Sequence, residues 1–214
     1  MSTTFRALAA IACTATLLAT GCAREITGSP VLAAGQTPGQ RWLPDADCTT
    51  VEARLAEVPS LSPREPAVRI PIPAGWQRNS TMDSQVIRFA LVAESLIANG
   101  FVPNAVVTLE RARGVADPRD VFEESRANLI RMMNAADLRS ENTTTCGFPA
   151  ETTTFTAPPM GPVPRRSVIM HAVVAQRGNA TYLVTLTIQT SNGADPTYQR
   201  DAEQIVDGFQ VLLP

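Results

Sequence analysis

The sequence predicts an α+β fold in which an antiparallel β-sheet carries α-helices packed on its faces. Segments rich in β-branched and apolar residues follow one another through short turns, such as Gly178-Asn179, which is a typical two-residue hairpin turn. Two Ala-Asp-Pro triplets, beginning at Ala116 and Ala194, mark helix starts within this series of strands. Helices inserted among strands that are joined by tight turns are typical of an α+β protein.

The N-terminus has the composition of a secretory signal peptide, predicted for residues 1–21. Arg6 is its only charged residue, and the uncharged run over residues 7–19 is shorter than the about 20 apolar residues that cross a bilayer. Thr20-Gly21-Cys22 resembles the end of a bacterial lipobox, although Ala19 stands where Leu is usual. We therefore expect cleavage before Cys22 and acylation of its thiol, which anchors the chain to the lipid bilayer. A plain secretion signal cut at another small residue is the alternative.

The remaining chain is predicted to form a tether and one domain. Residues 22–44 contain several glycines and prolines and little hydrophobic periodicity, which is typical of a flexible tether. Residues 45–214 are long enough for a single domain with a substantial core. The expected location is the outer face of the plasma membrane, with the domain held there by the lipid on Cys22.

Cysteine usage predicts one disulfide bond. Cys13 leaves with the signal peptide and Cys22 is acylated, so the mature domain keeps only Cys48 and Cys146. Two cysteines in an exported protein most simply pair, and the chain-entropy model gives about 4 to 5 kcal/mol for a loop of roughly 100 residues. A redox or nucleophilic cysteine is the weaker alternative, because there is no CxxC motif and His171 is the only histidine.

In the first half of the domain, Val51, Leu55 and Val58 lie at helical spacing, so we expect a helix over residues 47–58 that ends at Pro59. Strands are expected at residues 68–73, 86–91 and 104–111. Pro71 and Pro73 in the first of these segments suit an edge strand or the start of a strand.

The second half begins with a helix whose N-cap is Asp117 and whose apolar stripe runs from Phe122 through Leu129 to Met133. Strands are expected at residues 138–145, 151–156, 167–176 and 182–189, with a turn at residues 147–149. The strand at 167–176 is nearly all apolar, so both of its faces should be covered. The last helix starts after Asp195, buries Tyr198 and neighbours at helical spacing, and ends at residue 208.

Composition excludes several classes of function. The net charge is −2 and there is no block of basic residues, which argues against nucleic-acid binding. All 18 basic residues are arginine, so Schiff-base and P-loop lysine chemistry is excluded. The sequence contains no GxSxG, HExxH, GxGxxG or EF-hand motif, and one histidine does not build a His-rich metal site. We therefore expect no catalytic residues, metal or cofactor, and we interpret His171 as a hydrogen-bonded residue of the sheet.

Four segments resemble one known family. They are residues 70–76 (IPIPAGW), the turn at 147–150 (GFPA), the strand at 182–188 (YLVTLTI) and the helix end at 202–209 (AEQIVDGF). Together they resemble the mycobacterial LpqN/LpqT lipoprotein family from about Val68 to the C-terminus. The resemblance implies a Mog1/PsbP-like α/β sandwich in the cell envelope. It also implies a role in envelope lipid biogenesis or host interaction, and brings no catalytic residues with it.

A group of flexible and aromatic apolar side chains is a candidate ligand pocket. Thioethers and aromatic rings line adaptable pockets for acyl chains, although most such groups form ordinary core. The candidate residues are Phe122, Leu129, Met132, Met133, Phe155 and Met170. The leading hypothesis is a non-enzymatic domain that binds an envelope lipid or glycolipid. The alternative is a protein-interaction module that engages an envelope transporter or a host protein through loops such as residues 158–162. An enzyme is the third hypothesis and would need convergent polar groups near His171.

Overall fold

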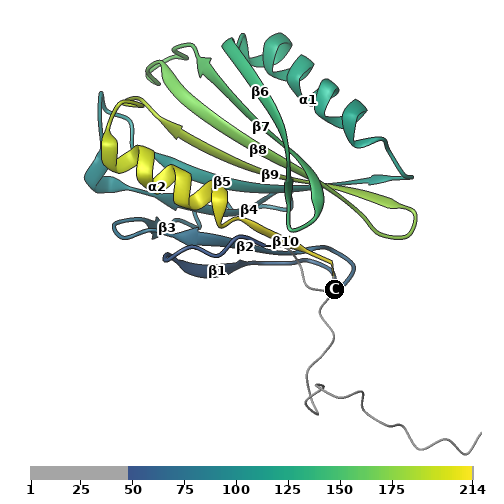
Figure 1. The fold of residues 1–214 in the computed structure, drawn as a ribbon. Helices are drawn as coiled ribbons and strands as arrows, with labels where there is room; N and C mark the ends of the chain where they lie inside the picture. The colour runs from purple at the N-terminus through teal and green to yellow at the C-terminus, as the bar shows by residue number, and fades with distance from the viewer. Residues whose placement is uncertain (1–47, 214) are drawn as a thin grey trace, which may run out of the picture. The chain divides into compact units, whose positions relative to one another are not determined.

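A computed structural model describes residues 48–213 (Figure 1). The predicted signal peptide, Cys22 and the tether lie outside the described residues. Residues 48–213 form two antiparallel β-sheets and two α-helices, so the predicted α+β class is confirmed.

The larger sheet has seven strands in the order β3-β4-β5-β9-β8-β7-β6. Its strands are β3 (Gln77–Arg78), β4 (Ile87–Val92), β5 (Asn104–Arg113), β6 (Ala136–Thr145), β7 (Phe148–Ala157), β8 (Arg166–Gln176) and β9 (Ala180–Thr190). Every neighbouring pair is antiparallel. The strands predicted for this sheet are confirmed, but the turn between β6 and β7 lies at Cys146-Gly147, and Phe148 and Pro149 already belong to β7.

The smaller sheet has the order β1-β2-β10, from β1 (Arg54–Val58), β2 (Ala67–Ile72) and β10 (Gln210–Leu212). The helix predicted for residues 47–58 is wrong, because β2 supplies the whole of β1 with an antiparallel partner, from Arg54 opposite Ile72 to Val58 opposite Val68. Neither of the two positions predicted for the prolines applies to Pro71, since β2 is the central strand and Pro71 lies near its end. Proline is tolerated there because β10 pairs only with residues 67–69.

Both predicted helices are confirmed with their N-caps. In α1 (Pro118–Met133) the Asp117 carboxylate accepts a hydrogen bond from the backbone N–H of Arg119 at 2.9 Å. In α2 (Pro196–Asp207) Asp195 caps in the same way. Gly208 ends α2, and a Cβ at this position would lie 2.4 Å from Cγ2 of Val51, so glycine is required by close packing. A short 3-10 helix, η1 (Glu94–Leu96), follows β4.

The larger sheet is covered on both faces. Side chains alternate along a strand, so successive residues of β8 enter different layers. Val173 packs with the smaller sheet and α2, whereas Ala172 and Val174 pack under Phe122 of α1. This confirms the prediction that both faces of β8 are buried. In Figure 1, α2 lies beside the smaller sheet, and α1 lies apart from both over the end of the sheet that carries β6 to β8.

The structure contains the disulfide bond predicted from the cysteine count. The Sγ atoms of Cys48 and Cys146 are 2.03 Å apart, and the two residues are 98 positions apart in the chain. The bond joins the first described residue to the turn between β6 and β7, so it ties the start of the domain to the larger sheet.

Candidate functional site

The six predicted pocket residues do not line one common cavity among those found in residues 48–213. Leu129, Phe155 and Met170 pack together in a closed cluster, and Phe122 belongs to a neighbouring one. Met132 and Met133 are 81% and 42% exposed. Leu129 is the last residue of α1 that belongs to a buried cluster, so the apolar stripe loses its cover in the final turn of the helix.

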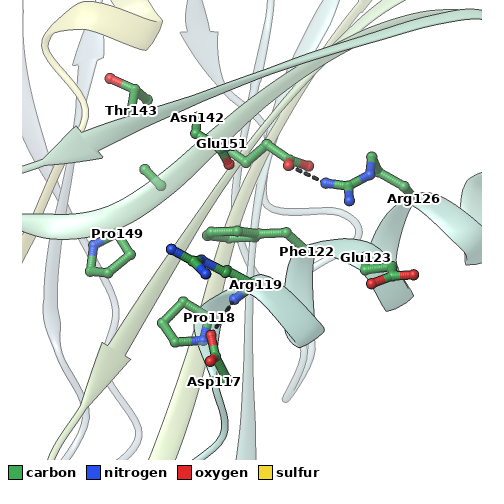
Figure 2. Close-up of a pocket in the computed structure, with 11 residues that line it drawn as sticks. Asp117, Pro118, Arg119, Phe122, Glu123, Arg126, Asn142, Thr143, Pro149 and Glu151 are labelled. Carbon is green, nitrogen blue, oxygen red and sulfur yellow. Dashed lines mark hydrogen bonds and ion pairs between the residues drawn. The ribbon is translucent and has the colours of Figure 1, made fainter.

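A cavity of about 530 Å³ does lie under the first half of α1, and charged side chains from α1 and β7 are among the residues that line it (Figure 2). Arg126 of α1 forms an ion pair with Glu151 of β7, whose side chain is only 2% exposed. Figure 2 shows the Arg126–Glu151 pair on one side of the Phe122 ring. The guanidinium of Arg119 lies near the same ring on its other side. Since the buried carboxylate is already neutralised by Arg126, this cavity offers little unpaired polar surface to a ligand.

A second cavity, about 620 Å³, lies between α2 and strands β6, β7 and β8. We call it the α2 groove. Ala202 and Val206 of α2 and Ile169 of β8 give it an apolar wall. Thr152, Thr154 and Thr156 line it from β7, since alternate residues of a strand point to one face. The groove therefore combines an apolar wall with a row of hydroxyl groups.

Tyr198 also lines the α2 groove and is 4% exposed. Its phenolic oxygen is buried and has no hydrogen-bond partner among the described residues. Burial raises the pKa of this phenol, so it stays protonated across the neutral range. An unpaired buried hydroxyl costs about 1 to 3 kcal/mol, and a bound polar group would remove that cost.

His171 lines a polar cavity of about 370 Å³ beside the disulfide bond, which shares Thr152, Val206 and Asp207 with the α2 groove. Its Nε2 is 2.7 Å from the hydroxyl of Thr145, and its Nδ1 is 2.8 Å from that of Thr152. Burial lowers the pKa of the imidazole to about 4. The interpretation of His171 as a hydrogen-bonded residue of the sheet is confirmed. A neutral ring whose two nitrogens both have partners is poorly suited to general-base catalysis near neutral pH.

Two further observations concern metal and membrane binding. Among residues 48–213, no three or more His, Cys, Asp or Glu side chains are placed to hold a metal ion. Neither α-helix of this part of the chain has the length and apolarity needed to cross a membrane.

Comparison with known proteins gives the family. The model of the family described as probable lipoprotein LpqN matches residues 50–212. The chain belongs to the LpqN family. The predicted resemblance is thereby confirmed. No curated protein sequence matches the chain significantly.

Solved structures agree with this family assignment. The crystal structure of LpqN of Mycobacterium tuberculosis, described as involved in cell envelope biogenesis, matches with a TM-score of 0.60 and 18% identity, covering 76% of this chain and 92% of that one. Similarity at this level shows a shared fold. The Ran-binding protein Mog1p of Saccharomyces cerevisiae matches more loosely, with a TM-score of 0.43, 12% identity and coverage of 74% and 96%.

Two elements that line the α2 groove, α2 and β7, were predicted from the sequence, but the cavity between them was not. Tyr198 and Ala202 were expected in the buried stripe of α2, and the Thr-rich segment was expected to form a strand. The alternation of Thr152, Thr154 and Thr156 is a usable signal for a hydroxyl-bearing face. The empty space beside that face depends on where α2 lies, which no local pattern specifies.

Proposed function

We propose that this chain is a non-enzymatic, membrane-anchored binding domain that holds an envelope lipid or glycolipid in the α2 groove. The observation that carries the proposal is the lining of the groove, where apolar side chains, a row of threonines and Tyr198, whose buried hydroxyl is unpaired, line one space. The envelope role described for LpqN of M. tuberculosis supports the choice of an envelope ligand.

The apolar wall suits the hydrocarbon part of such a ligand. Ala202 is 1% exposed, and with Val206 and Ile169 it presents no polar side-chain atom to the groove. The volume of about 620 Å³ lies within the range of about 300 to 1,000 Å³ that is typical of ligand sites. Removing the apolar surface of an acyl chain from water there contributes about 25 cal/mol per Å².

The hydroxyl row suits the polar part of the ligand. Alternate residues of a strand are about 7 Å apart, so the three threonines present regularly spaced hydroxyl groups along β7. Thr152 already bonds His171 and Thr156 bonds Asp137, whereas Thr154 has no side-chain partner among the described residues. Thr154 and Tyr198 are therefore the groups best placed to bond the hydroxyls of a sugar.

The test compares the wild-type protein with a groove-filling variant. Thr154 is exposed and points into the groove, so Thr154→Trp fills the space without disturbing the core. Thr187→Trp is the matched control, because Thr187 lies on the opposite face of the sheet, opposite Met170 in the β8–β9 register. Native mass spectrometry of protein purified from its host membrane should show retained lipid, or a shift on adding a trehalose glycolipid, for the wild type and the control only. Absence of both signals from the wild-type protein would overturn the proposal.

The proposed location rests on Cys22, which anchors the domain to the outer face of the plasma membrane through its lipid. Cys22→Ala should release the protein into the soluble fraction, because the apolar segment before it is too short to span the bilayer. Continued association of this variant with the membrane would contradict the anchor.

A protein-interaction module is the second candidate, favoured by the exposure of large apolar side chains. Ile130 and Met132 near the end of α1 are 55% and 81% exposed, and Met160 in the loop between β7 and β8 is 67% exposed. Exposed methionines adapt to the shape of a protein partner. Cross-linking in intact cells should then capture one specific envelope or host protein, and Met132→Ser with Met160→Ser should abolish its capture. Capture that is unchanged in the variant would argue against this surface.

A further inference from the structure

A second cavity adjoins the α2 groove where β8 begins. It has a volume of about 360 Å³ and shares Thr156 and Ser167 with the groove. Arg165 and Arg166 both line it, and we call it the arginine cavity. We propose that the arginine cavity is an anion site that takes a tetrahedral phosphate or sulfate group.

The two arginines provide positive charge that is not neutralised locally. Within residues 48–213, neither Arg165 nor Arg166 lies within ion-pair distance of a carboxylate, whereas five other arginines do. No carboxylate is among the residues that line this cavity, and Asp137, which accepts a hydrogen bond from Thr156 at 3.3 Å, is exposed and lines the α2 groove. An anion in this cavity therefore meets two guanidinium groups with free hydrogen-bonding capacity.

Arg166 is held in place by its surroundings. Its Cζ lies 5.7 Å from the centre of the Phe101 ring, in cation–π geometry. Its Nε is buried and has no hydrogen-bond partner among the described residues. A buried charged donor without an acceptor is unfavourable, and an oxyanion bound by the rest of this guanidinium lowers the cost of burying its charge. The planar guanidinium fork also matches the spacing of two oxygens on phosphate or sulfate.

Polar groups from other segments complete the cavity. The hydroxyl of Ser167 has no hydrogen-bond partner among the described residues and is free to donate. The Nδ2 group of Asn99 lies 3.5 Å from the carbonyl oxygen of Ser191, which leaves its second hydrogen available. The donors thus come from the loop after η1 and from the start of β8, as expected for a site that surrounds its ligand.

The position of the arginine cavity defines the class of ligand for the α2 groove. This step rests on the proposed function, because it joins the anion site to a lipid in the groove. An amphiphile with a phosphate or sulfate headgroup fills both spaces, with its charge on Arg165 and Arg166 and its chains along α2. Free inorganic phosphate or sulfate is the other source of the same chemistry.

The experiment compares two lipids that differ only in a phosphate group. Dioctanoyl phosphatidate and dioctanoylglycerol are titrated below their aggregation limits against wild type, Arg165→Gln with Arg166→Gln, and the control Arg113→Gln. Arg113 is an exposed arginine in the last position of β5, and its change removes the same kind of charge. We expect the wild type and the control to prefer the phosphatidate by about tenfold, from one or two charge-assisted hydrogen bonds. The double variant should lose this preference and keep its affinity for dioctanoylglycerol.

Thermal unfolding in sodium sulfate, compared with sodium chloride at equal ionic strength, separates the two proposals. Sulfate stabilises folded proteins generally because it is excluded from their surface, and the double variant measures this general effect. Sulfate should raise the Tm of the wild type and of Arg113→Gln by more than it raises the Tm of the double variant. A sulfate effect without binding of either lipid supports the anion site and contradicts lipid binding. Equal affinity for both lipids, a preference that survives in the double variant, or no response to sulfate and lipids would overturn the anion site. If the double variant fails to fold, the exposed Arg165→Gln variant is used in its place.

Discussion

Replacing Tyr198 by Phe is expected to change the stability of the domain and its affinity for a ligand in opposite directions. The phenolic oxygen is buried in the wall of the α2 groove and has no partner among the described residues. Leaving such a group unpaired costs about 1 to 3 kcal/mol, and Phe removes the group while keeping the ring. We therefore expect Tyr198→Phe to raise the free energy of unfolding of the ligand-free protein by about 1 kcal/mol, which is about 2 to 4 °C in Tm for a domain of this size.

The same substitution should weaken binding. If the hydroxyl bonds the polar part of a lipid, its loss lowers affinity by about tenfold, since 1.4 kcal/mol is a factor of ten. Stabilisation of the free protein together with loss of affinity is the expected signature of a group retained for binding.

The pH dependence of unfolding provides an independent check. Burial raises the pKa of Tyr198 above its ordinary value near 10. The stabilisation associated with keeping this phenol protonated is fully present below pH 10 and is lost as the pH rises above it. Tyr198→Phe should lack this part of the alkaline loss in urea denaturation curves recorded between pH 8 and pH 11.

Tyr182→Phe is the matched control, because Tyr182 is also buried but lines a separate cavity with Arg64 and Arg177. It should leave lipid affinity unchanged. A loss of 1 kcal/mol or more in the ligand-free Tyr198→Phe protein would refute the reasoning, since it would mean that the hydroxyl is satisfied within the native structure.

Three further predictions concern the stability of the domain. Burial lowers the pKa of His171 to about 4, so the native state excludes a proton that the unfolded chain binds below about pH 6.5, and stability should fall by about 3 kcal/mol between pH 6.5 and pH 4. His171→Gln should flatten this fall in urea denaturation curves, and an unchanged pH profile would contradict the assignment. Reduction of the Cys48–Cys146 bond should lower the free energy of unfolding by about 4 kcal/mol, because it closes a loop of 98 positions. A Cys48→Ser variant should not respond to reductant, and equal stability with and without reductant in the wild type would count against the bond. Arg126→Met should cost about 2 kcal/mol, because it leaves the Glu151 carboxylate buried, with a discount for the partial exposure of Arg126. Adding Glu151→Gln should recover most of this loss in thermal unfolding, whereas additive losses would show that the pair is not coupled.

Local signals in the sequence predicted the elements that depend on local chemistry. The Asp-Pro pairs at Asp117 and Asp195 located the starts of both helices, because an aspartate N-cap and a proline in the first turn act within a few residues. The alternation from Tyr182 to Ile188 predicted β9 and its buried face. The cysteine count was sufficient for the disulfide bond, since only two thiols remained to pair.

Features that depend on distant segments were not predictable. Val51, Leu55 and Val58 have helical spacing, but β2 provides a strand partner for residues 54–58, and Val51 lies against Gly208 at the end of α2. The stripe of α1 predicted burial of Met133, which is 42% exposed, because the sequence does not show where the underlying strands end. For the same reason the candidate pocket was expected at α1, whereas the open space with unpaired polar groups lies beside α2.

The position of a photo-cross-link from a bound lipid shows directly whether the α2 groove holds the acyl chain. A trehalose glycolipid with a photoreactive group in its acyl chain is bound to the intact protein, cross-linked and mapped by peptide mass spectrometry. We expect cross-links to the apolar wall of the α2 groove, at or next to Ile169 and Val206. These cross-links should disappear in the Thr154→Trp variant. Cross-links confined to the exposed methionines of α1, or a pattern unchanged by Thr154→Trp, would contradict lipid binding in the α2 groove.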